Sequence, residues 1–215
     1  MAVNADGGLA TYLEEVAAGT PTPGGGSVAA VVGALAAALG EMVANLTLGR
    51  AKYAGAESSL GPGRARLTLL RTALLEAAAA DEAAYQSYRA AAILPRSSES
   101  EKTARTVAMQ RALITATDVP LRVARSLHEV AKILQSMARD GNPHVRSDAA
   151  LGALLAEAAL RGVLLNVRGN AAMLKDRELA LAYLADANRL EEAGREAAQT
   201  AYQIAMEVAD ERGSR

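Results

Sequence analysis

The chain of 215 residues contains no cysteine, no phenylalanine and no tryptophan, and only six tyrosines. The lack of cysteine excludes disulfides, thiolate metal sites and cysteine nucleophiles. Without large aromatic rings, a hydrophobic core must be built from Leu, Val, Ile, Met and especially Ala. Alanine is the best helix former and lets neighbouring helices approach closely. These absences therefore favour a protein made of tightly packed helices.

An excess of charge of either sign is also missing, because 23 basic residues face 24 acidic ones and the net charge is −1. Such a chain has no strong overall field to attract nucleic acid or an anionic membrane. Its basic residues are mixed with acidic ones and are not interleaved with aromatics, which argues against an RNA-binding surface. The two histidines, His128 and His144, are far apart and lack metal-binding spacing, so we expect no metal.

The hydrophobic runs of the sequence are shorter than a segment that crosses a bilayer. The segment from Val28 to Leu39 is the most apolar, but it is too short to span a bilayer, and Glu41 and Asn45 interrupt its extension. The first eight residues lack the pattern of a signal peptide. We therefore expect a buried core helix here, no membrane association and a cytoplasmic location.

Apolar residues recur at threes and fours through most of the chain, and no stretch alternates as a strand does. We predict an all-α, up-and-down bundle of long helices forming one domain over residues 1–215. The expected helices cover residues 9–17, 27–53, 64–92, 101–139, about 147–175 and 177–212. We expect a loop over 55–63 and a kink or break near Pro120. Since the second helix is apolar nearly all round, we predict that it is nearly fully buried and that the chain forms a homodimer.

The sharpest local feature is the run from Thr22 to Ser27, Thr-Pro-Gly-Gly-Gly-Ser, which opens the long second helix. Three glycines let a ligand approach the backbone, and a helix N-terminus offers free N–H groups and partial positive charge. No Gly-Lys-Ser/Thr follows, so this is not a nucleotide loop. The run is either a cradle for a polar group or a flexible helix entry capped by Ser27. The candidate binding residues are Pro23, Gly24, Gly25, Gly26 and Ser27.

A second group of candidates lies in the fifth predicted helix. Asp148 stands near the start of this helix, where it is either an N-cap or a carboxylate that faces a pocket. Asn166 and Asn170 lie one turn apart on an otherwise apolar stretch, and buried amides need hydrogen-bond partners from the protein or a ligand. Weaker candidates are the Asp81–Tyr85 pair, Asn45 inside the apolar helix, and Arg50 and Lys52 at its end.

The chain resembles the family that contains the cyclodeaminase part of formiminotransferase-cyclodeaminase and the stand-alone methenyltetrahydrofolate cyclohydrolases. The resemblance extends from about Leu9 to Asp176. It rests on residues 20–30, 33–35, 42–47, 118–121, 141–148 and 166–170. His144 and Gly169 depart from the pattern, which puts Asn and an aliphatic residue at these positions, and they leave the substrate preference open.

The resemblance implies a helical, usually dimeric protein that binds a tetrahydrofolate derivative and needs no other cofactor. A cyclohydrolase opens the cationic methenyl bridge between N5 and N10 with water, whereas a cyclodeaminase closes that bridge from a formimino group and expels ammonia. A carboxylate near the bridge would balance the charge and move protons. We expect Asp148 first and Asp81 second in this role.

The resemblance also suggests roles for the remaining candidates. Asn166, Asn170 and Asn45 would bind the pterin edge or orient water, and the run from Gly24 to Ser27 would hold a polar part of the folate. Lys52 or Arg50 would meet the glutamate tail. The family-like region starts almost at Met1, without a formimino-transferring domain before it, and we therefore favour a cyclohydrolase. The alternatives are a cyclodeaminase and a non-catalytic folate-binding or scaffolding dimer.

Overall fold

The computed structural model describes the backbone of residues 8–213 and the side chains of residues 8–207. Over this range the chain is helical and contains no strand. The elements in chain order are α1 (Gly8–Ala17), α2 (Gly25–Asn45), the 3-10 helix η1 (Ala51–Ala56), α3 (Glu57–Ala92), α4 (Glu99–Asp140), the 3-10 helix η2 (Pro143–Val145), α5 (Arg146–Ala172) and α6 (Arg177–Gly213). The expected all-α class is confirmed.

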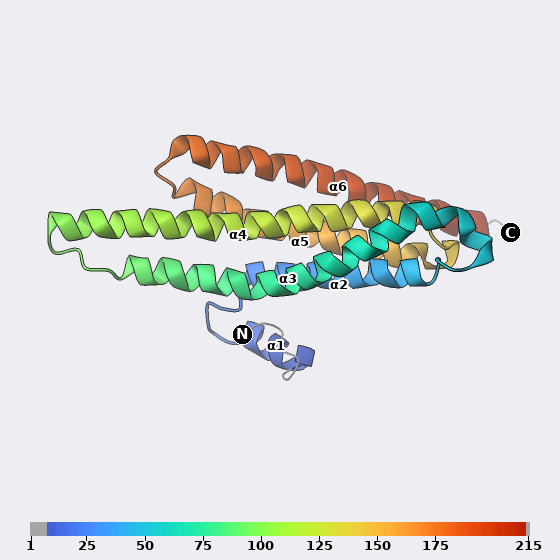
Figure 1. The fold of residues 1–215 in the computed structure, drawn as a ribbon, viewed down its shortest axis with the longest axis horizontal. Coiled ribbons are helices and arrows are strands. Elements are labelled where there is room, and N and C mark those ends of the chain that lie inside the picture. The colour runs from blue at the N-terminus through green and yellow to red at the C-terminus, as the bar shows by residue number, and fades with distance from the viewer. Residues whose placement is uncertain (1–7, 214–215) are drawn as a thin grey trace.

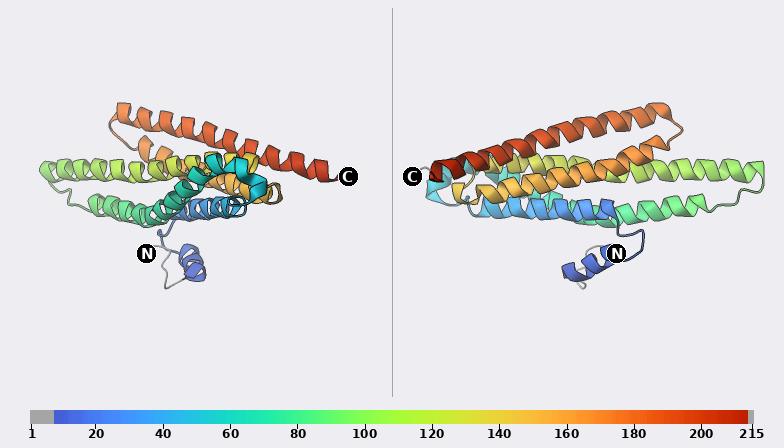
Figure 2. Two further views of the ribbon diagram at one scale, coloured as in Figure 1. Left: turned by 45° about the vertical axis from the view of Figure 1, so that its right-hand side comes forward. Right: turned by 180° about the vertical axis from the view of Figure 1, so that it is seen from behind.

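The long helices run roughly along one axis and form a bundle around α4, against which α2, α3, α5 and α6 all pack (Figure 1). Helix α2 also packs between α3 and α5. In the views of Figures 1 and 2, α1 stands apart from the bundle beside the start of α2. It is joined to the bundle mainly by Tyr12, which is buried and contacts Ser27 through its hydroxyl group at 3.0 Å.

The boundary between the second and third helices differs from our prediction. Helix α2 ends at Asn45 rather than near Tyr53, and Gly49 has a φ of +75°, a backbone conformation that suits glycine. The predicted loop over residues 55–63 is wrong, because α3 begins at Glu57 and continues across Pro62. Burial of Leu60, which is 1% exposed, anchors this first part of α3 in the core and offsets the backbone hydrogen bond that proline removes.

We expected a kink or break near Pro120, and of these the break is wrong, since α4 is continuous from Glu99 to Asp140. A proline lacks the N–H that would bond the carbonyl four residues earlier, here that of Ala116. The side-chain amide of Asn170 on α5 donates a hydrogen bond to this carbonyl at 2.6 Å. A neighbouring helix thus supplies the donor that the proline removes, and α4 runs on.

The starts of α6 and α5 differ in their caps. Asp176 accepts a hydrogen bond from the N–H of Leu179 at 3.0 Å and caps α6. For α5, the interpretation of Asp148 as an N-cap is wrong: the helix begins at Arg146 and its first turn has no side-chain cap. Asp148 therefore lies inside the first turn of α5, where a negative charge suits the helix dipole.

Helix α2 is less enclosed than its composition suggested. Its inner side carries small residues, and a Cβ on Gly33 or Gly40 would overlap side chains of α3 and α4. Its outer side leaves Leu35 at 51% and Met42 at 37% exposure, so one side of the helix is open in the single chain. Close packing on one side therefore accompanies a free apolar surface on the other.

Within the part of the chain that the structure describes, two segments are long and apolar enough to cross a membrane by length and composition alone: α2 and residues 143–172. Between half and two thirds of each hydrophobic window is buried within the bundle. The core helices of soluble proteins pass the same test. The hydropathy of α2 and α5 is therefore explained in part by the core that they build.

Candidate active site

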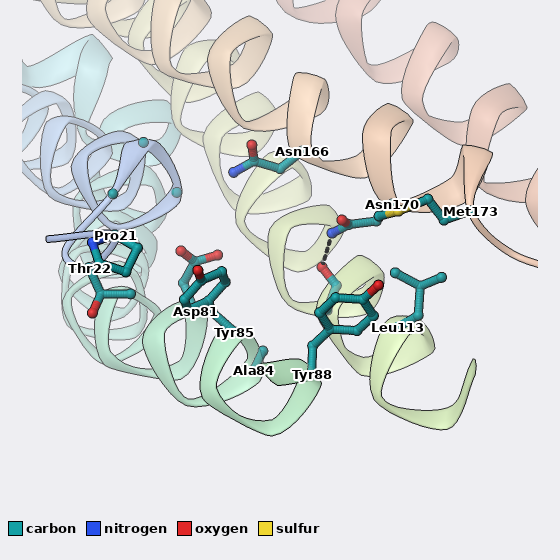
Figure 3. A pocket seen from close by; sticks show the side chains of 14 residues that line it. Pro21, Thr22, Asp81, Ala84, Tyr85, Tyr88, Leu113, Asn166, Asn170 and Met173 are labelled. Carbon is teal, nitrogen blue, oxygen red and sulfur yellow. Dashed lines mark hydrogen bonds between the residues drawn. The ribbon is translucent and has the colours of Figure 1, made fainter. Parts of the chain in front are cut away.

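A cavity of about 340 Å³ opens where α2 begins (Figure 3). Its walls come from the turn before α2 and from α3, α4 and α5, four parts of the sequence that lie far apart. The lining residues are Pro21, Thr22, Gly24, Gly25, Gly26, Asp81, Ala84, Tyr85, Tyr88, Leu113, Ala116, Asn166, Asn170 and Met173. A mostly apolar cavity with a few convergent polar groups is typical of a small-molecule site.

Asp81 of α3 is the carboxylate of this cavity. It accepts a hydrogen bond from the backbone N–H of Ser27, in the first turn of α2. The residue preceding α2, Gly24, makes no side-chain cap, so the carboxyl group of another helix takes that place. A Cβ on Gly26 would overlap the Asp81 carboxyl group. Glycine at this position is therefore what allows the carboxylate to sit against the start of α2.

The environment of Asp81 changes its acidity. Burial raises the pKa of its carboxyl group, and the nearby negative charge of Glu82 raises this pKa further. The N–H of Ser27 opposes both effects by favouring the ionised form, and the net pKa is raised. A carboxyl group with a raised pKa at a cavity wall is suited to accept and return protons.

The two asparagines of α5 that line the cavity differ in their side-chain hydrogen bonds. Asn170 is held by its hydrogen bond to Ala116, shown as the dashed line in Figure 3. Asn166 lies one turn earlier, points toward the cavity, and makes no side-chain hydrogen bond to the described part of the chain. Its amide is therefore available to a ligand, whereas that of Asn170 is partly used by the fold.

Two of the six tyrosines of the chain also line the cavity, and both belong to α3. Tyr85 and Tyr88 follow Asp81 by four and seven residues, so the three side chains lie on one side of the helix (Figure 3). Sequence reasoning placed the Asp81–Tyr85 pair among the weaker candidates and missed Tyr88. The i, i+4, i+7 spacing was the signal that would have found it.

The predicted site residues separate into two groups. Gly24, Gly25, Gly26, Asp81, Asn166 and Asn170 line the cavity. Ser27 lies directly behind it, where its N–H binds Asp81 and its hydroxyl group contacts Tyr12. Pro23 belongs to the same turn, between the cavity residues Thr22 and Gly24. The glycine-rich run and the α5 amides, which sequence patterns singled out separately, therefore meet.

The second group lies at the other end of the bundle. Asp148 precedes Asn166 by 18 residues on α5, a distance of about 27 Å along a helix. Asn45 ends α2 about 30 Å from its first residue, and Lys52 follows it. None of these three residues lines the cavity of its own chain.

At that end, polar groups bind one another instead. Asn142 is 5% exposed and its side chain donates to the carbonyl of Leu46 at 3.2 Å. Its oxygen accepts from the hydroxyl group of Tyr53 at 2.8 Å and from the N–H of His144 at 3.0 Å. The N–H of Asn142 donates to the Thr47 hydroxyl group at 3.0 Å. This network ties the loop between α4 and α5 to the end of α2.

Metal ligation has little support in the described part of the chain, where no three His, Asp or Glu side chains gather as a metal site would require. The cavity itself offers a single carboxylate, two amides and two phenol groups. This set suits an organic ligand with hydrogen-bonding edges and an aromatic ring.

Comparison with known proteins gives a consistent result. The profile of a family described as Formiminotransferase-cyclodeaminase matches residues 8–189. A methenyltetrahydrofolate cyclohydrolase of Methylorubrum extorquens is 42% identical over 80% of this chain and 83% of its own. A formimidoyltransferase-cyclodeaminase of Gallus gallus is 36% identical over 78% of this chain, which matches 30% of the length of that larger protein.

The fold also has a close counterpart among solved structures. The crystal structure of a formiminotetrahydrofolate cyclodeaminase from Thermotoga maritima superposes with a TM-score of 0.84 at 30% sequence identity. The match covers 94% of this chain and 96% of that one. The whole bundle, and not a single helical hairpin, is therefore shared.

Proposed function

Because the chain belongs to the formiminotransferase-cyclodeaminase family, we propose that it is a methenyltetrahydrofolate cyclohydrolase, which converts 5,10-methenyltetrahydrofolate and water to 10-formyltetrahydrofolate. The observation that carries the proposal is a cavity in which the half-buried carboxyl group of Asp81 meets two amides and two tyrosines. The methenyltetrahydrofolate cyclohydrolase of Methylorubrum extorquens is 42% identical and matches over most of both chains.

Asp81 has the central role in the proposed reaction. The methenyl bridge carries a positive charge, which the ionised carboxylate offsets at short range. The carboxylate takes a proton from water as the water oxygen bonds to the bridge carbon, giving a neutral tetrahedral carbon. The bond from this carbon to N5 then breaks, and its electron pair stays on N5. N5 receives the proton from Asp81, and the hydroxyl proton leaves to solvent as the formyl group forms.

The other cavity residues bind and orient the substrate in this proposal. The free amide of Asn166 contacts the polar edge of the pterin or the attacking water, and Tyr85 and Tyr88 pack against the pterin ring. The helix start at Gly25 and Gly26 faces a polar group of the folate. No cofactor other than the folate is required, and we place the protein in the cytoplasm as a soluble enzyme.

A second candidate is formiminotetrahydrofolate cyclodeaminase, favoured by the 0.84 TM-score to the Thermotoga maritima enzyme of that name. Both reactions pass through a tetrahedral carbon between two nitrogens and need a proton carrier at nitrogen. The same Asp81 therefore serves either chemistry, and the cavity alone does not separate them. A third candidate is a folate-binding protein without turnover.

An absorbance time course with purified protein and 5,10-methenyltetrahydrofolate tests the proposal. Loss of the methenyl chromophore above the spontaneous rate, in proportion to enzyme concentration, supports the cyclohydrolase. If there is no acceleration, ammonia release from 5-formiminotetrahydrofolate is measured next, and a positive result there replaces the proposal by the cyclodeaminase. Failure of both with retained folate binding would leave the binding protein.

A further inference from the structure

Helix α1 is attached to the bundle through one side only. Within α1, which the structure describes in full, Tyr12 is the only buried residue. Val16 follows one turn later on the same side and also packs against the core. On the opposite side, Leu9 and Leu13 are more than half exposed. A change at Tyr12 should therefore loosen α1 while the long helices keep their own core.

The segment that links α1 to α2 forms part of the cavity wall. Pro21, Thr22 and Gly24 of this segment line the cavity, and the first two are drawn at its wall in Figure 3. One end of the segment continues into α2, and the other end is tied to the bundle through Tyr12. The placement of α1 therefore helps to shape the wall, although none of its own residues lines the cavity.

The side chain of Tyr12 extends from α1 to the start of α2. Its hydroxyl group shares a hydrogen bond with the side-chain hydroxyl group of Ser27 at 3.0 Å, and both residues are almost completely buried. Buried hydroxyl groups need such partners, because leaving them unpaired costs free energy. The backbone N–H of the same serine donates to the carboxyl group of Asp81 on α3. Ser27 therefore joins Tyr12 to the carboxylate of the cavity.

The surroundings of Tyr12 keep its phenol group protonated. Burial raises the pKa of the phenol, and the hydrogen bond with Ser27 lowers it in part. Nearby negative charges raise this pKa further, namely those of Glu82, Asp81 and Glu15. The net pKa lies above the ordinary value of a tyrosine. Tyr12 therefore remains a neutral hydrogen-bonding group beside three carboxylates.

The same groups define the electrostatic surroundings of Asp81. Its charged neighbour on α3 is Glu82, and α1 adds the phenol of Tyr12 and the carboxyl group of Glu15 to this cluster. The lining residues that α2, α4 and α5 contribute to the described cavity carry no charge. Burial has the largest effect on the pKa of Asp81. Its acidity therefore depends on the side chains that keep water from it.

We propose that Tyr12 is a positioning residue of the active site, which acts on Asp81 through Ser27 from behind the cavity. Its hydroxyl group fixes the serine whose N–H holds the carboxylate, and accurate placement of a reacting group matters for turnover. Its ring closes the cluster on the side of α1 and keeps water away. The role in turnover rests on the proposed function, whereas the effect on Asp81 itself does not.

The contribution of the hydroxyl group is tested with Tyr12→Phe, which keeps the ring. We expect kcat to fall about 3–10-fold, as the loss of one hydrogen bond predicts, with KM nearly unchanged. Ser27→Ala removes the other hydroxyl group, keeps the N–H that binds Asp81, and should have the same effect. Because both changes break one contact, the double variant should be no slower than either single variant. Additive losses, or an unchanged kcat in Tyr12→Phe, would overturn the action through Ser27.

The contribution of the ring is tested with Tyr12→Ala. Water would then reach Asp81 and lower its pKa toward about 3.9, so the pH at which turnover rises should move down. Tyr12→Phe should keep the wild-type pH dependence. The matched control is Leu13→Ala on the exposed side of α1, which should also keep it. Loss of folded protein alone would not move this pH, so an unmoved pH dependence in Tyr12→Ala would overturn the shielding role.

Carbon-13 NMR titration of the ligand-free protein separates this proposal from the proposed function. The carboxyl signal of Asp81, identified by its absence in Asp81→Asn, should titrate at lower pH in Tyr12→Ala than in the wild type and Leu13→Ala. Equal titration in Tyr12→Ala and the wild type would overturn the position given to Tyr12. The measurement needs no turnover, so a lower pKa in an enzyme that converts neither folate would retain the effect of Tyr12 and contradict only the proposed function.

Discussion

The two ends of α2 differ in how their unpaired backbone groups find partners. Every helix end leaves backbone groups without partners inside the helix. At the C-terminal end, Thr47 and Asn142 bind these groups and one another in a buried network. At the N-terminal end, three glycines and the distant Asp81 replace a local cap, and the remaining groups face a cavity. One end stabilises the fold, and the other is left open for a ligand.

The largest effect on activity is expected at the N-terminal end of α2, which faces the cavity. Asp81→Asn removes the proton carrier and should lower kcat/KM by about 10²–10⁴-fold. Because its folded-state pKa is raised, the ionised carboxyl group opposes folding at neutral pH, and the neutral amide should leave the melting temperature unchanged or higher. Kinetics and thermal unfolding check this result, with the exposed Glu76→Gln on the same helix as a control of unchanged activity. A parallel loss of stability and activity would contradict the catalytic role.

At the C-terminal end of α2, a substitution should lower stability rather than activity. Asn142→Ala removes several hydrogen bonds of a buried side chain and should lower the free energy of unfolding by about 2–4 kcal/mol. Activity per folded molecule should stay close to that of the wild type. Denaturant unfolding and an assay at low temperature measure the two quantities, with the exposed Ser147→Ala as control. A stable variant would show that the network does not hold the end of α2.

The same substitution, glycine to alanine, can be made near each end of α2 to compare the two ends directly. Gly26→Ala would push the carboxyl group of Asp81 away from the N–H of Ser27, and should reduce kcat/KM about tenfold or more. Gly40→Ala would press on Leu67 and Leu134 in the core and should cost about 1–3 kcal/mol of stability. Equal effects of the two variants on activity per folded molecule would contradict the division between the ends.

The smallest expected effect concerns the tyrosines of the cavity. Tyr88→Leu keeps an apolar side chain but removes ring packing, which contributes about 0.5–1.5 kcal/mol. We expect KM to rise by about 2–10-fold with little change in kcat, measured by the same chromophore assay. A change in kcat alone would assign Tyr88 a part in the chemistry rather than in binding.

Local patterns singled out residues that lie together at the N-terminal end of α2. The glycine run and the spacing of Asn166 and Asn170 are properties of short segments, and these residues line the cavity. The sequence analysis preferred Asp148 to Asp81, because the residues around each aspartate do not show which of the two packs against another helix. Only packing brings α3 across the start of α2, and the raised pKa of Asp81 follows from that burial.

The errors at Pro62 and Pro120 have a related cause. Each proline removes one backbone hydrogen bond, which alone favours a break. The burial of Leu60 and the amide donated by Asn170 come from neighbours that no local window contains. The all-α class, by contrast, follows from composition and periodicity and was predictable. Long-range partners therefore decide both the helix boundaries and which carboxylate lines the cavity.

The pH dependence of turnover tests the central claim most directly, since it reports on the carboxyl group at the open end of α2. Ionised Asp81 is the base, so the enzyme-dependent rate of methenyl loss, corrected for spontaneous hydrolysis, should rise with pH through one step. That step should lie above the value of about 3.9 of an ordinary aspartate and vanish in Asp81→Asn. A wild-type step at or below this value, or the same step in Asp81→Asn, would contradict the assignment of the base to this end.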